Sequence, residues 1–425
     1  MDQPRRFFPL AAGLAAFGAY CCMYAFRKPF TATDYAGAAA FGVIDFKTGL
    51  VIAQVLGYAL SKFIGIKVIS ELRPARRTAL FIGLIVAAEL ALVGFGVAGD
   101  HWLALPLLFL NGLPLGMIWG IVFSYLEGRR TTEILGAMLA TSFIVSSGVV
   151  KSVGAGLLQS GWVSSPYWMP AVTGGLFFLP LVGFAYWLRS LPPPTATDIA
   201  ARTRREPMHA RERGQLLRRL GPGLIGIVLY YVAVTALRDV RDNFAPELWS
   251  ALGYGGAPEV FTLAELPIAL LTLTPLLLGY FIADNRRALR YYHVLIVAST
   301  VLILVATAAF TAGWLPGVYW MVAVGLGLYL GYVPLNAIYF DRLVGAFRQV
   351  ATAGFLIYVA DASGYAGSVA ILLWRNFGQA DLSWLAFFTQ LAYLVGGLGL
   401  VAAAGSWYAL ERRLAAYPTP RLSAD

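Results

Sequence analysis

The chain alternates between long apolar stretches and short polar ones from end to end. Each apolar stretch is long enough for a helix to cross the hydrocarbon core of a bilayer. Twelve such stretches occur, and each is predicted to be a transmembrane helix. They cover residues 8–34, 47–70, 78–98, 102–125, 134–158, 166–188, 221–244, 260–283, 291–313, 315–340, 351–374 and 382–410.

A polar stretch in the middle of the chain separates two sets of six apolar segments. It begins with three prolines and continues with many arginines, which is typical of a linker. We therefore predict a six-helix bundle in residues 1–190, a basic cytoplasmic linker in 191–220 and a second six-helix bundle in 221–425. The pattern Gly-Leu-x-Leu-Gly occurs at 112–116 and again at 327–331. This repetition favours a duplicated architecture of the kind found in secondary transporters.

Composition excludes a soluble globular protein. Hydrophobic residues make up 59% of the chain and charged residues 13%, and the mean hydropathy is +0.70, so the chain is predicted to be an all-α polytopic membrane protein. Almost all Lys and Arg residues of the connecting segments fall on one side, and only Lys47 and Arg375 fall on the other. By the positive-inside rule, both termini are expected in the cytoplasm and the protein in the cytoplasmic (inner) membrane. The same rule explains the net charge of +10, so no nucleic acid partner is expected.

Two arginines lie in corresponding positions of the two halves, inside apolar segments. Tyr20, Tyr24 and Arg27 are spaced i, i+4, i+7, so two phenols and a guanidinium are predicted on one face of the first helix. Tyr231 and Arg238 repeat the spacing of seven in the second half. Snorkelling to the interface is the alternative explanation, but it would place both cations on the side that is poor in them. We predict that both arginines face a substrate.

Further charged residues are predicted at membrane depth. Similar depths allow two ion pairs between the halves, Lys62 with Asp361 and Lys151 with Glu265, and their role is either structural or gating. Glu89 is isolated and receives no function. Cations outnumber carboxylates in this set, which suits a doubly charged oxyanion bound by arginine forks. The cations of the set are Arg27, Lys28, Lys62, Lys151, Arg238 and Arg241, and its carboxylates are Asp239, Asp242, Glu265 and Asp361.

Several motifs resemble those of the organophosphate:phosphate antiporters of the major facilitator superfamily, which include glycerol-3-phosphate and hexose-phosphate transporters. The first helix of that family ends in Arg-Lys-x-Phe, matched here by residues 27–30, and its second carries Tyr-x-x-Ser-Lys-Phe, matched by 58–63. An arginine stands eight residues before a proline in its seventh helix, as Arg238 does here. The motif Val-Gly-x-Gly of the fifth helix is matched at 153–156, and the eleventh helix resembles 353–368.

The resemblance implies a fold of twelve helices in two pseudo-symmetric bundles and a site for an organic phosphate. By the resemblance, Arg27 and Arg238 grip the phosphate, and Lys62 and Lys151 assist or gate. The sequence departs from the family at Lys151, where the family has histidine. It departs again at Asn243, where the family has an acidic residue that Asp242 offers one position earlier.

The expected function is therefore secondary transport of an organic phosphate or related small anion by alternating access, in exchange for inorganic phosphate. A proton-coupled organic-anion symporter using Asp361 or Glu265 and a non-transporting membrane sensor are the alternatives. An enzyme is not expected, because the three histidines fall in or beside loops, and no cofactor or metal site is expected. The expected partners are the small anion and the lipid bilayer, with the monomer as the functional unit. The predicted substrate-binding residues are Arg27, Arg238, Lys62, Lys151, Tyr20, Tyr24 and Tyr231, and the predicted gating residues are Lys28, Asp242, Glu265, Asp361, Arg241 and Asp239.

Overall fold

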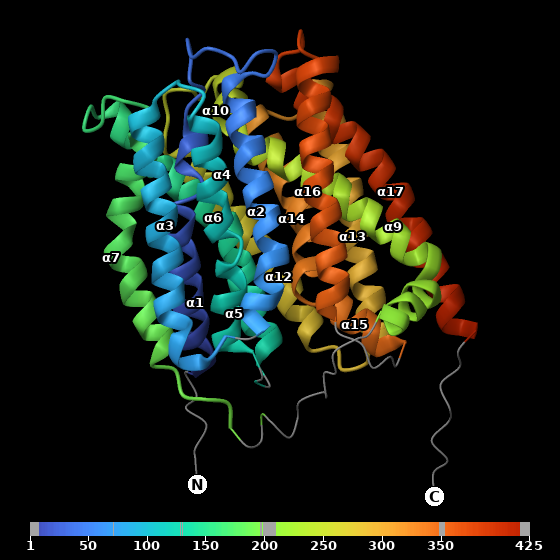
Figure 1. Ribbon diagram of the computed structural model, residues 1–425. Helices are drawn as coiled ribbons and strands as arrows, with labels where there is room; N and C mark the ends of the chain where they lie inside the picture. Colours follow the sequence, from blue (N-terminus) through green and yellow to red (C-terminus); the bar gives the residue numbers. More distant parts are fainter. Residues whose placement is uncertain are drawn as a thin grey trace, which may run out of the picture.

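A computed structural model describes residues 8–70, 72–127, 129, 131–195, 198, 210–347 and 353–416. Every regular element in this part of the chain is a helix (Figure 1), as predicted. Eleven helical segments are long and apolar enough to cross a membrane, and the shorter apolar helix α1 (Phe8–Tyr24) accounts for the twelfth predicted stretch. The remaining helices, some of which together make up one span, are α2 (Phe46–Ser70), α3 (Arg77–Ala98), α4 (Ala104–Leu115), α5 (Ile118–Leu126), α6 (Thr132–Gln159), α7 (Met169–Arg189), α9 (Ala210–Asn243), α10 (Ala245–Ala251), α11 (Val260–Leu263), α12 (Glu265–Tyr280), α13 (Asn285–Thr311), α14 (Gly317–Ala337), α15 (Tyr339–Ala346), α16 (Ala353–Gly378) and α17 (Trp384–Ala416). Two 3₁₀ turns, η1 (Pro29–Ala32) and η2 (Pro74–Arg76), complete the described elements.

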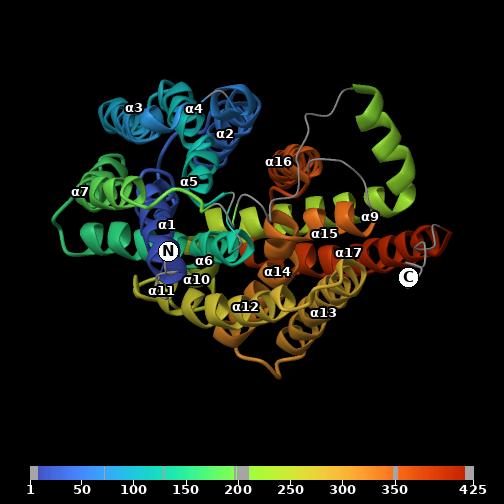
Figure 2. The same cartoon turned by 90° about the horizontal axis from the view of Figure 1, so that it is seen from below.

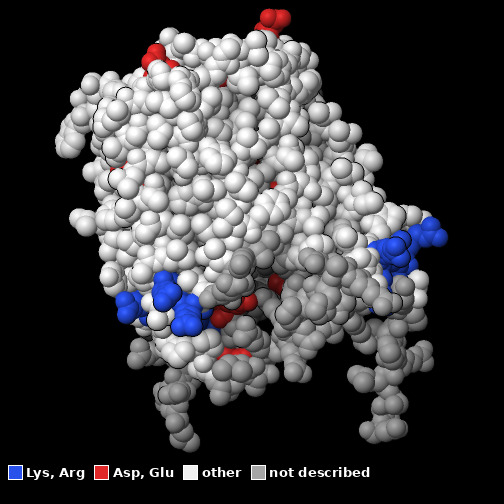
Figure 3. Space-filling view, in the orientation of Figure 1, with Lys and Arg blue, Asp and Glu red and all other residues white. Residues whose placement is uncertain are grey.

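The helices form two groups, α1 to α7 and α9 to α17, which are seen side by side from below in Figure 2. The groups meet where α2 packs on α16, and where α6 packs on α11, α12 and α14. Helix α1 begins and α17 ends at the same end of the molecule, the lower end in Figure 1, which we call the basal end. The opposite end is called the distal end. Exposed Lys and Arg side chains gather toward the basal end in Figure 3.

The first helix is shorter than the sequence predicts. The apolar stretch runs to residue 34, but α1 ends at Tyr24, so Arg27 lies in a turn rather than on the helix. Pro29 explains why the helix does not continue, because proline has no N–H to donate to the carbonyl four residues before it and its ring clashes with that carbonyl. The backbone N–H groups of Arg27 and Lys28 both donate to the Tyr24 carbonyl, at 3.0 and 2.9 Å, and η1 follows.

Three other predicted spans are also interrupted. The fourth is split into α4 and α5 just after Pro114, and the tenth into α14 and α15 after Pro334. The eighth is split into α11 and α12 at Ala264. Each of the two prolines removes a backbone N–H donor near the end of its helix. The apolar sequence continues through these breaks, so hydrophobicity alone does not reveal them.

Part of the predicted linker is helical. Helix α9 begins at Ala210, inside the stretch assigned to the linker, and bends at Gly221, whose φ is 50°. Before it, α7 ends at Arg189. Residues 196–197 and 199–209 lie outside the described residues.

Helices α2 and α4 are in backbone contact through two glycines. A Cβ atom on Gly57 would lie 2.1 Å from the Phe109 carbonyl oxygen, and one on Gly112 would lie 2.2 Å from the Gln54 carbonyl oxygen. Small residues allow such close approach in membranes. This contact fixes α2, which carries several residues of the site described next.

Candidate functional site

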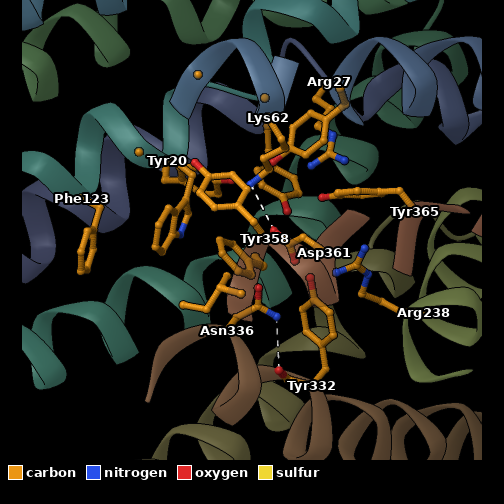
Figure 4. A pocket seen from close by; sticks show the side chains of 18 of the residues that line it. Tyr20, Arg27, Lys62, Phe123, Arg238, Tyr332, Asn336, Tyr358, Asp361 and Tyr365 are labelled. Atoms are coloured by element: carbon orange, nitrogen blue, oxygen red, sulfur yellow. Dashed lines mark hydrogen bonds and ion pairs between the residues drawn. The ribbon is translucent and has the colours of Figure 1, made fainter. Parts of the chain in front are cut away.

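A cavity of about 240 Å³ lies between the two groups of helices. Its wall is formed mainly by α1, α2, α5, α9, α14 and α16, so both halves of the chain contribute (Figure 4). Phenol groups dominate it, and they offer both aromatic faces and hydroxyl groups to a ligand. The tyrosines of the lining are Tyr20, Tyr24, Tyr58, Tyr329, Tyr332, Tyr358 and Tyr365.

Arg27 enters this cavity from the turn after α1. Its guanidinium carbon lies 3.9 Å from the centre of the Tyr58 ring and 5.8 Å from that of Tyr24. The residue is 8% exposed, and among the described residues it has no carboxylate partner and its Nε no acceptor. Contact with aromatic faces stabilises a cation only in part, so Arg27 retains capacity to bind an anion.

Two buried amides hold the turn that carries Arg27. Gln54 donates to the Arg27 carbonyl at 2.9 Å and to Asn111 Oδ1 at 2.7 Å. Asn111 in turn donates to the carbonyls of Phe26 and Ala88, both at 3.0 Å. The end of α1 leaves backbone carbonyls without helical N–H donors. The two side-chain amides supply hydrogen-bond donors to the carbonyls of the turn that follows. Neither amide was predicted to belong to the site.

Arg238 lies on the opposite wall, within α9. Its Nε and Nη2 donate to Asp239 Oδ1 at 3.1 and 2.7 Å, and its guanidinium carbon is 4.3 Å from the centre of the Tyr332 ring. Both arginines therefore line one cavity, but of the two only Arg238 has a carboxylate beside it within the described ranges.

Of the two ion pairs predicted between the halves, the structure contains Lys62–Asp361. The Lys62 Nζ lies 3.5 Å from Asp361 Oδ2, and Figure 4 shows the pair at the cavity wall. The Tyr231 hydroxyl donates to Asp361 Oδ1. Asn336 Nδ2 donates to the same hydroxyl at 3.1 Å, and the Tyr231 ring is stacked on Tyr332 with centres 5.3 Å apart.

The second predicted pair, Lys151–Glu265, is absent from this conformation. Lys151 instead pairs with Asp242 of α9, and Glu265 accepts from Arg241 Nη1 at 2.6 Å. The neighbouring positions 241 and 242 explain the exchange, since α9 offers a cation to α12 and a carboxylate to α6. Asp242 also pairs with Lys28 at 2.5 Å.

Further polar contacts join the halves at the distal end. Lys47, which is 2% exposed, donates to both carboxylate oxygens of Glu247 in α10 at 2.6 and 2.8 Å. Burial raises the pKa of the Glu247 carboxyl, and Lys47 opposes that rise. Asn376 at the distal end of α16 bonds the backbone of Asp45 and Val43, at 3.1 and 2.8 Å.

The cavity opens toward the basal end. Its lining includes Gly65, Ser124 and Glu127, which lie in the basal parts of α2 and α5 or just beyond them. The pairs that Lys28, Lys47 and Lys151 form with carboxylates of the other half close the distal end. The conformation is therefore open on the side of the chain ends and closed on the other.

Positive charge does not exceed negative charge in the lining. Lys151 and Arg241 lie behind the cavity rather than in it, and Glu127 contributes a carboxylate that was not counted. The predicted surplus of positive charge within the cavity is thus wrong, although no described carboxylate pairs with Arg27. The charged lining residues are Arg27, Lys28, Lys62, Arg238, Glu127, Asp239, Asp242 and Asp361.

Sequence reasoning missed most of the tyrosines. Their spacing carried a usable signal, because polar residues recur at i, i+3 and i+7 on one face of α14 and again on one face of α16. The two sets are Tyr329, Tyr332 and Asn336, and Tyr358, Asp361 and Tyr365.

Comparison with solved structures identifies the fold. A D-xylose-proton symporter is similar, with 15% identity, a TM-score of 0.62 and coverage of 94% of this chain and 96% of that chain. The proton:xylose symporter XylE bound to 6-bromo-6-deoxy-D-glucose is 15% identical, with a TM-score of 0.63 and coverage of 94% of this chain and 95% of that chain. A bacterial homologue of the human lysosomal transporter Spinster, in an inward-facing and occupied conformation, is 13% identical. Its TM-score is 0.63, and the match covers 99% of this chain and 100% of that chain.

These likenesses show the major facilitator superfamily fold, as the motif resemblance implied, in a multi-pass membrane protein. Membership of the organophosphate antiporters stays a prediction. A search of curated protein sequences found no match. Residues 29–413 match the model of a family of unknown function, DUF5690, and the chain therefore belongs to that family.

Proposed function

We propose that this protein is a secondary transporter that moves a small organic anion, a phosphate ester or a related acid, by alternating access. The observation that carries the proposal is Arg27, a buried guanidinium on the cavity wall with no carboxylate partner among the described residues. A buried arginine keeps its proton and is costly to leave without a counter-charge. A bound anion supplies that charge.

The surroundings of Arg27 fit an oxyanion. A guanidinium offers two parallel donors to a phosphate or carboxylate. The buried Nε1 of Trp119, which lines the same cavity, is a further donor that has no acceptor among the described residues. Arg238 lies across the cavity and has one guanidinium nitrogen, Nη1, beyond the two that bind Asp239. Tyrosine hydroxyls around these groups suit the hydroxyl groups of a phosphorylated or acidic metabolite.

The arrangement of the halves supports transport. The cavity opens at one end of the molecule while ion pairs between the halves close the other, which is the geometry of one state of an alternating-access cycle. The distribution of Lys and Arg supports a cytoplasmic basal end in the cytoplasmic membrane. Exchange for inorganic phosphate is carried over from the motif resemblance, and the monomer is proposed as the functional unit.

Counterflow in proteoliposomes tests the proposal. Purified protein is first screened for thermal stabilisation by phosphate esters, carboxylates and amines, since a ligand that prefers the folded state raises its stability. Vesicles loaded with each stabilising compound are then assayed for uptake of a labelled trace of it. We expect anions to stabilise the protein and to show counterflow. Stabilisation by amines alone contradicts the anion assignment, and anion binding without counterflow favours the sensor.

A further inference from the structure

The ion pair between Lys62 and Asp361 is the most open of those at the site. Its atoms are 3.5 Å apart, whereas Lys28–Asp242 is 2.5 Å, and the pairs of Arg238 and Arg241 are 2.7 and 2.6 Å. The Lys62 side chain is 17% exposed, more than that of any other cation in these pairs. Lys62 is therefore the paired cation that a ligand reaches most easily.

The pair also lies at a distinct place between the halves. At the distal end, Asn376 of α16 bonds Asp45 just before α2, and α2 and α16 then meet through the Tyr58 and Tyr365 rings, whose centres are 5.5 Å apart. Lys62–Asp361 follows toward the basal end, where the cavity opens. An anion in the cavity meets this pair on the wall.

We propose that Asp361 couples anion transport to protons: an anion that binds Lys62 displaces Asp361, and Asp361 then takes up one proton for each anion carried. This inference rests on the proposed function. Asp361 is 7% exposed, and a buried carboxylate that has lost its cation is expensive to keep ionised. A proton is the smallest group that removes this cost.

The groups around Asp361 are compatible with a change of protonation. Helix α2 presents Lys62 and Tyr58, α9 presents Tyr231 and Arg238, α14 presents Tyr332, and α16 itself presents Tyr358 and Tyr365. Arg238 is held by Asp239, so Lys62 is the cation bonded to Asp361. The Tyr231 hydroxyl is able to donate to the ionised carboxylate or to accept from the protonated one.

The proton balance of the cycle is simple. The proton enters from the same side as the anion and forms an O–H bond on the Asp361 carboxyl while the anion occupies Lys62. On the other side the anion leaves, Lys62 and Asp361 pair again, and the proton returns to water. One anion and one proton thus move in the same direction, and a monoanion crosses without net charge transfer. The carrier returns without an anion, so this coupling takes the place of the exchange for inorganic phosphate that the motif resemblance implies.

The geometry favours Asp361 over Glu265, the other carboxylate considered for this role. Glu265 accepts from Arg241 at 2.6 Å in the closed distal part of the site. It does not line the cavity, and its partner is an arginine, which keeps its charge. An anion in the cavity therefore has no direct contact by which to displace Glu265.

Wild-type protein gives the first test. In weakly buffered detergent solution with a pH indicator, addition of an anion found in the counterflow screen is expected to remove about one proton from solution per anion bound. In vesicles with an imposed pH difference, electroneutral coupling supports accumulation of a monoanion by up to about tenfold per pH unit. Binding without proton uptake, together with counterflow insensitive to the pH difference, overturns the inference while leaving the proposed function intact.

Variants locate the proton. In Asp361→Asn the number of protons taken up per bound anion is expected to fall to near zero, and Asp361→Glu is expected to restore it. The matched control is Glu89→Gln, a carboxylate within α3 that lies outside the cavity and packs against Gly174, and it is expected to retain proton uptake. Unchanged proton uptake in Asp361→Asn, or its loss in Glu89→Gln, contradicts the assignment. If Asp361→Asn does not fold, the wild-type measurement and Asp361→Glu still decide. Absence of anion binding in wild type would contradict the proposed function itself.

Discussion

Arg27 and Arg238, which are predicted to correspond in the two halves, differ in their surroundings. Arg27 lies over the Tyr58 ring with no carboxylate partner in the described part of the chain, and Arg238 lies over the Tyr332 ring with Asp239 beside it. We therefore expect an anionic ligand to gain more from Arg27, whose charge no neighbouring carboxylate among the described residues compensates. At Arg238 it must share the guanidinium with a carboxylate.

The first prediction concerns Arg27→Lys and Arg238→Lys. Lysine keeps the charge but offers no planar pair of donors. A charge-assisted hydrogen bond contributes about 1.5–3 kcal/mol, so loss of one fork is expected to weaken anion binding by well over tenfold. The double variant is expected to be little worse than either single one, since effects at a shared site do not add. Isothermal titration with the best anion of the screen measures this.

Arg412→Lys is the control for the arginine variants, because Arg412 is exposed near the basal end of α17 and lies over the Tyr408 ring. Its substitution is expected to leave affinity unchanged. Equal affinity of wild type and Arg27→Lys, in samples of equal melting temperature, would remove Arg27 from the site.

Charged members of the site were predictable from sequence. One of the two predicted pairs, Lys62–Asp361, is present in the structure, whereas the partners of Lys151 and Glu265 were not predicted. Lys62 and Asp361 stand out because a charge inside an apolar stretch is rare. Which carboxylate pairs with Lys151 depends on how α9 is oriented toward α6. The spacing of residues within one helix does not determine that orientation. Tyrosines such as Tyr332 escape notice because a membrane helix tolerates them without a functional reason.

At the scale of elements, hydrophobicity predicted how many spans there are but not where they break. The apolar character of 102–125 continues through the turn between α4 and α5. Proline carries the missing information, as Pro29 shows at the end of α1. The amides Gln54 and Asn111, which make that ending possible, look like ordinary polar residues until α2 and α4 are placed together.

The second prediction tests this support through the contact of α2 with α4. In Gly112→Ala the new Cβ would lie 2.2 Å from a backbone oxygen, so the helices must separate and the adjacent amide network must shift. Overpacking of this kind typically costs about 1–3 kcal/mol. We expect a lower melting temperature and weaker anion binding, although Gly112 does not line the cavity. The control is Gly175→Ala in α7, where a Cβ meets nothing within 4 Å. Equal melting temperatures and affinities for the two variants would contradict this account of the contact.

At the scale of the whole molecule, ion pairs between the halves close the distal end and the cavity opens basally. Lys28, Lys47 and Lys151 of the first half all pair with carboxylates of the second. Transport requires these contacts to part and the basal ends of the helices to approach. The described conformation thus defines which residues water should reach first.

The last prediction concerns that accessibility, measured by labelling single cysteines with a membrane-impermeant maleimide. The background is Cys21→Ser with Cys22→Ser, which removes both native cysteines. Ser124 lines the cavity near its basal opening, so Ser124→Cys is expected to react only when the reagent reaches the basal side. Ser160 is exposed after the distal end of α6, so Ser160→Cys is expected to react from the distal side. With a cytoplasmic basal end, intact cells should label Ser160→Cys, and Ser124→Cys should label only in inverted vesicles. Rapid labelling of Ser124→Cys in intact cells would show that the orientation or the closed distal end is wrong.

A transported anion should then slow labelling of Ser124→Cys in inverted vesicles, because it fills the cavity and favours closure of the basal side.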